Sequence, residues 1–206
     1  NCVKDTVITI IEPPALTITA VQQQSVSCYG TYNGIASCTV TGGNPGYNYT
    51  WYDAANNIVS ITYTAGSLGA GNYTVVASDI NGCSTQTAVI INQPFPISFT
   101  ISQVVDTSGC LGAPTNTIYI SASGGVGNYT YTSIPAGITS SANVNVPSGS
   151  YTIIVGDANG CSTYTLFNVA LPPAYSMTAT QVQSVTCNGL ANGSASVNVV
   201  GGGGSY

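Results

Sequence analysis

The sequence contains no histidine and almost no charge. Among its 206 residues there is one Lys or Arg and there are six Asp or Glu, so charged side chains make up 3% of the chain. General acid–base catalysis, metal binding and contacts with phosphate groups depend on these residue types. We therefore expect no enzymatic activity, no catalytic residues, no cofactor, no metal site and no nucleic-acid partner.

Long apolar runs are missing as well. The mean hydropathy is positive, at +0.28, but candidate runs such as residues 7–11 are short and interrupted by Thr9. A helix that spans a membrane needs about 20 consecutive, mostly apolar residues. The sequence therefore predicts no membrane insertion in this segment.

Helical periodicity is absent, and the pattern that is present is that of strands. Val, Ile, Thr and Tyr alternate with small polar residues, and clusters of Gly, Asn and Pro separate these runs. Alternation with a period of two indicates half-buried strands. About seven short strands in a segment of about 80 residues are typical of an immunoglobulin- or fibronectin-like β-sandwich. We predict an all-β fold, made of tandem sandwich modules of this kind in an elongated array.

An internal repeat divides the chain. The motif Asp-x-Asn-Gly-Cys-Ser-Thr occurs at residues 79–85 and 157–163, and the motif Gln-Ser-Val-Ser/Thr-Cys occurs at residues 24–28 and 183–187. Gly-Gly and Gly-x-Tyr-Thr markers recur in the same order between them. Several ordered markers at one period are the sequence signature of a modular array.

The repeat sets the predicted domain boundaries. We expect the last strand of a preceding module at residues 1–14, complete modules at residues 15–94 and 95–173, and the first part of a following module at residues 174–206. Because both ends are out of phase with the repeat, we expect the protein to continue in both directions. Proline marks the joints between modules, and it should end strand pairing and stiffen the passage from one module to the next.

Seven cysteines indicate an oxidising compartment. Each complete module has one cysteine after its first strand region and one in its Asn-Gly-Cys turn. On this basis we predict the disulfides Cys28–Cys83 and Cys110–Cys161. Each would close a long loop and could stabilise its module by roughly 4 kcal/mol.

This scheme leaves three cysteines unpaired within the segment. Cys2 and Cys187 would need partners upstream and downstream of it. Cys38 lies on an apolar strand position, where the later copies have Ile120 and Val197. Two interpretations of Cys38 stay open, of which a buried free thiol is favoured over an intermolecular cross-link.

Asp79 and Asp157 each begin an Asn-Gly-Cys turn. A short acceptor at this place typically caps a turn whose glycine adopts a positive φ. The alternative is a calcium ligand, but calcium sites gather several carboxylates and each joint offers at most one. The turn-capping role is therefore favoured.

Tyrosine is abundant, with 14 residues. Five tyrosines occupy repeated strand positions, which is typical of core and sandwich-corner residues: Tyr47, Tyr49, Tyr73, Tyr129 and Tyr151. Three others are not repeated and are candidates for exposed rings that stack on sugars: Tyr29, Tyr32 and Tyr52.

One set of motifs runs through nearly the whole chain. It consists of Ser-Val-Ser-Cys-x-Gly at 25–30, Asn-Gly-x-Ala at 33–36, Gly-Gly-x-Pro-x-Tyr-x-Tyr-x-Trp at 42–51, Gly-x-Tyr-x-Val at 71–75 and Asp-x-Asn-Gly-Cys at 79–83. This set resembles the SprB-type repeat of very large cell-surface gliding adhesins of Bacteroidota. The middle module departs from the pattern, because it lacks Asn-Gly after Cys110 and Trp after Tyr131.

The resemblance implies secretion by the type IX system, attachment to the outer membrane, display outside the cell and adhesion linked to gliding. The implied partners are surface glycans or abiotic surfaces, further repeats of the same chain, and the motility or secretion machinery. Thr6, in Asp5-Thr6-Val7, also matches the Asp-Thr/Ser-aliphatic O-glycosylation site of that group.

Three functions remain open on the sequence. The favoured one is a cell-surface adhesin or filament stalk. The second is a passive spacer or carbohydrate-binding appendage of a secreted enzyme, which a catalytic domain elsewhere in the protein would favour. The third is a self-assembling extracellular fibre, which would show strand contacts between subunits.

Overall fold

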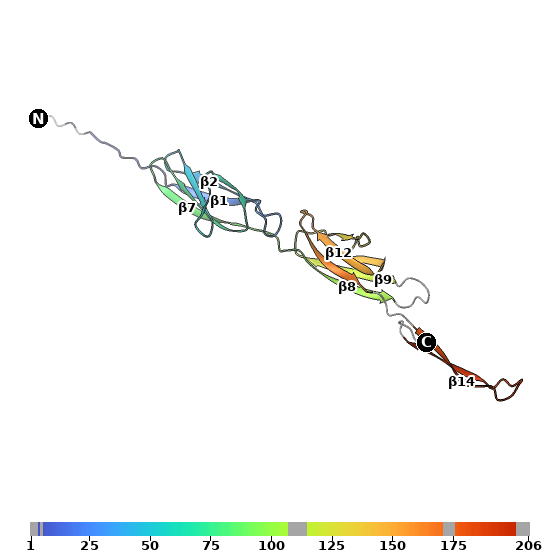
Figure 1. The fold of residues 1–206 in the computed structure, drawn as a ribbon. Helices are drawn as coiled ribbons and strands as arrows, with labels where there is room; N and C mark the ends of the chain where they lie inside the picture. The colour runs from blue at the N-terminus through green and yellow to red at the C-terminus, as the bar shows by residue number, and fades with distance from the viewer. Residues whose placement is uncertain (1–3, 5, 107–114, 171–175, 201–206) are drawn as a thin grey trace. The chain divides into compact units, whose positions relative to one another are not determined.

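The structure is a computed structural model, and it describes residues 4, 6–106, 115–170 and 176–200. In this part of the chain there are fifteen strands, β1 to β15, and no helix. None of the described residues therefore belongs to a helix that could cross a membrane. The chain divides into two compact units, Asn1–Pro96 and Ile97–Tyr206 (Figure 1).

The first unit is a β-sandwich of seven strands. They are β1 (Thr17–Gln24), β2 (Gly34–Thr41), β3 (Asn48–Tyr52), β4 (Ile58–Ser60), β5 (Thr64–Leu68), β6 (Gly71–Ser78) and β7 (Ser84–Ile91). One sheet has the order β1-β2-β5 and the other the order β4-β3-β6-β7, with antiparallel pairing throughout. The period-two pattern is plain in β6, where Tyr73, Val75 and Ala77 are buried and their neighbours are not.

Both sheets of the first unit contribute to one hydrophobic core. Ala36 of β2, Trp51 of β3 and Val75 of β6 are fully buried in it. The Trp51 Nε1–H donates to the carbonyl of Thr62 at 2.8 Å. The largest side chain of the core is therefore buried with its polar atom satisfied, as stable burial of an indole requires.

The second unit contains a sandwich of six strands and a separate hairpin. The sandwich strands are β8 (Ser98–Asp106), β9 (Thr115–Ser123), β10 (Thr130–Ile134), β11 (Ala142–Val146), β12 (Gly149–Gly156) and β13 (Ser162–Val169). They form two antiparallel sheets with the orders β11-β9-β8 and β10-β12-β13. Among the described residues of this unit, no strand corresponds to β4.

The missing strand has a physical explanation in the core of the second unit. Trp51 lies opposite Val75 in the first unit, and Ser133 lies opposite Ile153 at the same register position in the second. Ser133 provides no large apolar side chain here, and the core of the second unit instead includes Ile138, which is fully buried. The Ser133 Oγ accepts a hydrogen bond from the Ile138 N–H at 3.1 Å. The segment 135–141 therefore folds inward and does not extend as an edge strand.

Each sandwich has a tyrosine corner. The hydroxyl of Tyr73, near the start of β6, donates to the carbonyl of Gly69 at 3.2 Å, and that of Tyr151, near the start of β12, donates to the carbonyl of Pro147 at 3.0 Å. A tyrosine that hydrogen-bonds back to the backbone in this place is a hallmark of immunoglobulin-like sandwiches. The expected role of these two repeated tyrosines is confirmed.

The hairpin consists of β14 (Ser176–Gln183) and β15 (Ser194–Val200). Its pairing shifts register between Gln181 and Gln183, as that of β1 and β2 does between Gln22 and Gln24. The hairpin thus repeats the first two strands of the first unit residue by residue.

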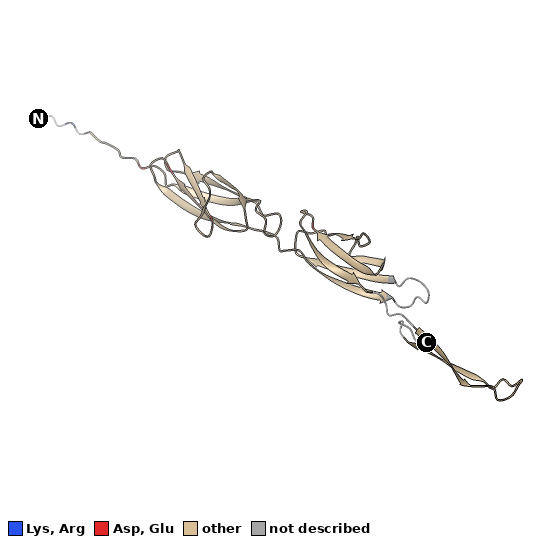
Figure 2. Cartoon of the chain, viewed as in Figure 1, with Lys and Arg blue, Asp and Glu red and all other residues tan. Residues whose placement is uncertain are grey.

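The all-β, immunoglobulin-like prediction is confirmed. Strands β1 to β7 lie within residues 15–94 and strands β8 to β13 within residues 95–173, whereas the module boundaries themselves stay predictions. The drawn ribbon carries almost no charged residue (Figure 2), so packing, strand pairing and turn hydrogen bonds must hold the sandwiches together.

Candidate functional site

The most elaborate polar structure of the first unit is the Asn-Gly-Cys turn, residues 79–83, between β6 and β7. Asp79 is 2% exposed, and its Oδ1 accepts from the backbone N–H groups of Asn81 at 3.0 Å and Cys83 at 2.9 Å. Its Oδ2 accepts from the N–H of Asn44 at 3.0 Å. Gly82 donates to the carbonyl of Asp79 and has a φ of 85°, which favours glycine.

The second unit contains the same turn at residues 157–161. Asp157 Oδ1 accepts from the N–H groups of Asn159 and Cys161, and its Oδ2 accepts from the N–H of Val126. Gly160 has a φ of 79°. The positive φ predicted for the glycine of this turn is therefore confirmed in both copies.

These contacts show what the two carboxylates do. Both oxygens of Asp79 and of Asp157 accept backbone hydrogen bonds, and the Asn44 N–H is the main cause of a lowered pKa for Asp79, which burial partly opposes. These hydrogen bonds agree with the favoured interpretation, in which Asp79 and Asp157 cap their turns. Among the described residues, no group of three or more acidic, cysteine or histidine side chains could hold a metal ion.

The second polar structure is the cysteine loop, residues 26–33, between β1 and β2. The Ser27 N–H donates to Asn33 Oδ1 at 2.9 Å, and the Asn33 amide donates back to Ser27 Oγ at 2.6 Å. The Thr31 N–H donates to the carbonyl of Cys28 at 3.2 Å. The loop is thus closed by one asparagine side chain across its base.

The hairpin β14–β15 carries a copy of this loop at residues 185–192. The Thr186 N–H donates to Asn192 Oδ1, the Asn192 amide donates to Thr186 Oγ1, and the Leu190 N–H donates to the carbonyl of Cys187. The sequence assigned no role to Asn33 and Asn192, although the repeated Asn-Gly dipeptide marked their positions. Their role is to fix the loop that presents the cysteine.

The cysteines differ between copies. Cys28 and Cys161 are disulfide-bonded, whereas Cys83 and Cys187 are free thiols on exposed residues. The predicted disulfide Cys28–Cys83 is therefore wrong. The predicted partner of Cys161, Cys110, lies outside the described residues, as does Cys2.

The strand that separates Cys28 from Cys83 explains the error. The turn with Cys83 precedes β7, and the cysteine loop lies beside the end of β7, because the Val26 N–H donates to the carbonyl of Asn92. The eight residues of β7 span about 26 Å at 3.3 Å per residue. A disulfide needs Cα atoms within about 7 Å of one another. The two cysteines lie at opposite ends of one sandwich, a fact that sequence order alone does not reveal.

Cys38 is a free thiol, and its side chain is buried in the core of the first unit. Its Sγ donates to the carbonyl of Tyr63 at 3.5 Å, and burial raises the pKa of its thiol. These observations agree with the buried-thiol interpretation and give no support to a cross-link at this position.

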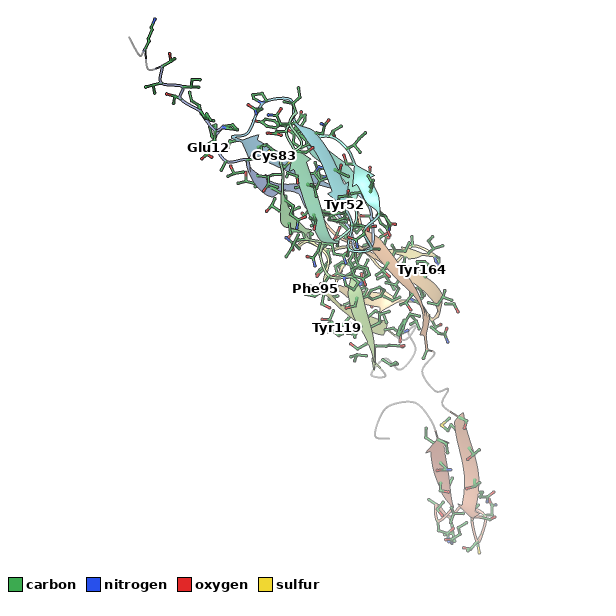
Figure 3. The ribbon with its side chains drawn as sticks, turned by 90° about the vertical axis from the view of Figure 1, so that its left-hand side faces the viewer. Glu12, Tyr52, Cys83, Phe95, Tyr119 and Tyr164 are labelled. Carbon is green, nitrogen blue, oxygen red and sulfur yellow. The ribbon has the colours of Figure 1, made fainter. Side chains whose placement is uncertain are left out.

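The candidate sugar-stacking tyrosines are placed differently. Tyr29 and Tyr32 belong to the cysteine loop and are 58% and 75% exposed. Tyr52 is only half-buried, at the end of β3 (Figure 3). Thr6, the predicted O-glycosylation site, is exposed, and its modification stays a prediction.

One protein family matches the two regions of the chain that contain these cysteine loops. The family model described as the SprB repeat matches residues 20–56 and 179–206, which contain the cysteine loops of β1–β2 and β14–β15. Two regions of the chain match the SprB repeat. The expected resemblance is confirmed, and at this level the chain is similar to adhesin-like repeat proteins of cell surfaces.

Other comparisons add little. No curated protein matches the chain. Among solved structures it is similar to one titled "Structure of amphioxus IgVJ-C2 molecule", with 13% sequence identity and a TM-score of 0.30 over 78% of this chain and 99% of that one. A likeness this low carries no argument about function.

Proposed function

We propose that this segment is a stalk region of a secreted cell-surface adhesin, exported by the type IX system, attached to the outer membrane and active in gliding. The observation that carries the proposal is the match to SprB repeats in two regions of one chain. Sandwiches without a dominant charged surface suit a spacer that works outside the cell, where long-range electrostatic effects are screened within about 8 Å.

Adhesion by this region would use its exposed aromatic side chains. Tyr29 and Tyr32 lie on one loop and keep more than half of their surface accessible. The faces of such aromatic rings stack on sugars through dispersion and the hydrophobic effect. We therefore propose surface glycans or abiotic surfaces as partners. Such binding should depend little on salt, because few charges take part.

An adhesion assay tests the binding part. Beads coated with the 206-residue protein should bind a glycan array or glass, and the double change Tyr29→Ala and Tyr32→Ala should reduce binding severalfold. Tyr164→Ala is the matched control, because Tyr164 is equally exposed, at 72%, on β13 of the other unit. Loss of binding in moderate salt, or no difference between the variants, would remove this part of the proposal.

Cell labelling tests the location. Antibody against this segment should label intact cells of the source organism, and labelling should vanish when type IX secretion is disabled. If the segment is instead found on a released enzyme, the function is that of a spacer or appendage.

A further inference from the structure

Within the described residues, the Asn-Gly-Cys turn and the cysteine loop each occur once with a disulfide-bonded cysteine and once with a free thiol. Cys161 is bonded and Cys83 is free in the two Asn-Gly-Cys turns, and Cys28 is bonded and Cys187 is free in the two cysteine loops. The hydrogen bonds that shape each pair of copies are the same. The free thiols are therefore held in backbone settings that carry a disulfide elsewhere in the chain.

The two structures lie at opposite ends of the first sandwich. The turn is tied to the end where the chain enters, because Asp79 binds Asn44 and the neighbouring Gly43 N–H donates to the carbonyl of Pro14 at 2.7 Å. Figure 3 shows Cys83 at the same end of this unit as Glu12. The loop is tied to the end where the chain leaves, because the Gly30 N–H donates to Gln93 Oε1 at 2.9 Å.

This placement decides which cysteines are complementary. In any head-to-tail series of repeats, the leaving end of one is followed by the entering end of the next, because the chain connects them. Like pairs, turn with turn or loop with loop, would join the same end of two successive repeats. These ends are about one repeat length apart along the series, far beyond the ~7 Å between Cα atoms that a disulfide allows.

We propose that the Asn-Gly-Cys turn and the cysteine loop are the two halves of a disulfide that joins one repeat of this protein to another. Cys83 takes the loop cysteine of another repeat, and Cys187 takes the turn cysteine of another repeat. This inference is independent of what the protein adheres to. It gives a covalent link between repeats in addition to the peptide chain.

The chemistry needs an oxidant of the disulfide class, such as oxidised glutathione. The thiolate of one cysteine attacks the glutathione disulfide and releases one reduced glutathione. The thiolate of the complementary cysteine then attacks the mixed disulfide, forms the S–S bond and releases the second glutathione. Two thiol protons and two electrons pass from the protein to the oxidant.

Two copies of the 206-residue chain provide the test. A ¹⁵N-labelled Cys83→Ser protein and an unlabelled Cys187→Ser protein are mixed in a glutathione redox buffer, quenched in acid and digested with pepsin, since Lys4 is the only site for trypsin. Mass spectrometry should find the unlabelled Cys83 peptide joined to the labelled Cys187 peptide. We expect this product to exceed each like-with-like product by about tenfold, which corresponds to a preference of about 1.4 kcal/mol.

A displaced thiol is the control. Gln86→Cys in an unlabelled protein that also carries Cys83→Ser and Cys187→Ser places an exposed thiol on β7, three residues beyond Cys83. Mixed with the labelled Cys83→Ser protein, it should show no preference for Cys187. The proposal is overturned if Cys83 pairs mainly with Cys83, if it pairs with Cys187 no more often than random pairing gives, if it ends only as a glutathione adduct, or if the displaced thiol does equally well.

Discussion

The two sandwiches share a framework and differ in what fills it. Both have the capped Asn-Gly-Cys turn, the tyrosine corner and the same central strand pairings. The first encloses Trp51 and has the edge strand β4, whereas the second has Ser133 at that position and buries Ile138 from the adjoining segment. The comparison teaches that turn and corner residues specify this fold, while the core composition can vary if volume and hydrogen bonds are restored together.

Removal of Trp51 should give the largest effect. Trp51→Ala leaves a large cavity and the Thr62 carbonyl without its donor, so we expect the first unit to lose about 3–5 kcal/mol of its free energy of unfolding. Hydrogen-exchange mass spectrometry, read on peptides of each unit, measures the loss. Trp51→Phe should cost clearly less, since it keeps most of the volume. Equal protection in wild type and Trp51→Ala would contradict a core built around the indole.

The second unit has a buried polar group where the first has none. Asn116 is fully buried, donates to the carbonyl of Val146 at 3.1 Å and accepts from Gln103 Nε2 at 2.7 Å. The corresponding residue of the first unit is Gly34, since it lies opposite Leu68 as Asn116 lies opposite Val146. Gly34 leaves no room for a side chain, because a Cβ there would lie 2.6 Å from Ile91 Cγ2.

Asn116→Ala should therefore destabilise only the second unit, by about 1–3 kcal/mol, because the buried Val146 carbonyl loses its donor and the half-buried Gln103 loses one of the two acceptors of its Nε2 group. The same hydrogen-exchange measurement tests this, with Asn168→Ala as the control, since Asn168 is exposed in the same sandwich. A change confined to the first unit, or no change, would show that the buried asparagine does not hold β9 to β11.

Much of this comparison could be predicted from the sequence, and some of it could not. Period-two alternation predicted the strands, and the repeated Asp-x-Asn-Gly and Gly-x-Tyr motifs predicted turns and corners, because these features depend on residues close together in the chain. The Cys28–Cys83 pair failed because pairing depends on which end of the sandwich each cysteine occupies. Ser133 and Asn116 gave no signal, since their partners are set by register across strands.

Acid should weaken the first unit through Asp79. Hydrogen bonds from Asn44 first, and then from Cys83 and Asn81, hold its pKa below the ordinary value of 3.8. The unfolded chain therefore takes up the proton first as pH falls. The stability that these bonds contribute is complete above 3.8, declines below it and is lost once pH falls through the folded pKa.

Denaturant unfolding followed by Trp51 fluorescence, from about pH 6 to about pH 2, measures this decline. Trp51 is the only tryptophan, so the signal reports the first unit alone. Asp79→Asn should flatten the curve. Asp53 also has a lowered pKa, caused mainly by Asn57, but it is bound only to its own loop. If Asp79→Asn leaves the curve unchanged and Asp53→Asn flattens it, the acid response comes from Asp53 and the prediction for Asp79 is wrong.

The smallest effect is expected at Cys38, where the two sandwiches differ by one apolar side chain. Cys38 on β2 pairs with Ala20 on β1, as Ile120 on β9 pairs with Ile101 on β8. The side chains of Cys38 and Ile120 are both buried. Cys38→Val should change the stability of the first unit by less than about 1.5 kcal/mol, because it nearly conserves volume and removes only a weak S–H donor.

In the native protein the Cys38 peptide should resist alkylation, since burial shields the thiol and raises its pKa, whereas the exposed Cys83 peptide should be labelled quickly. Equal labelling of the two peptides, measured by mass spectrometry before and after denaturation, would show that the core around β2 opens far more readily than its packing implies.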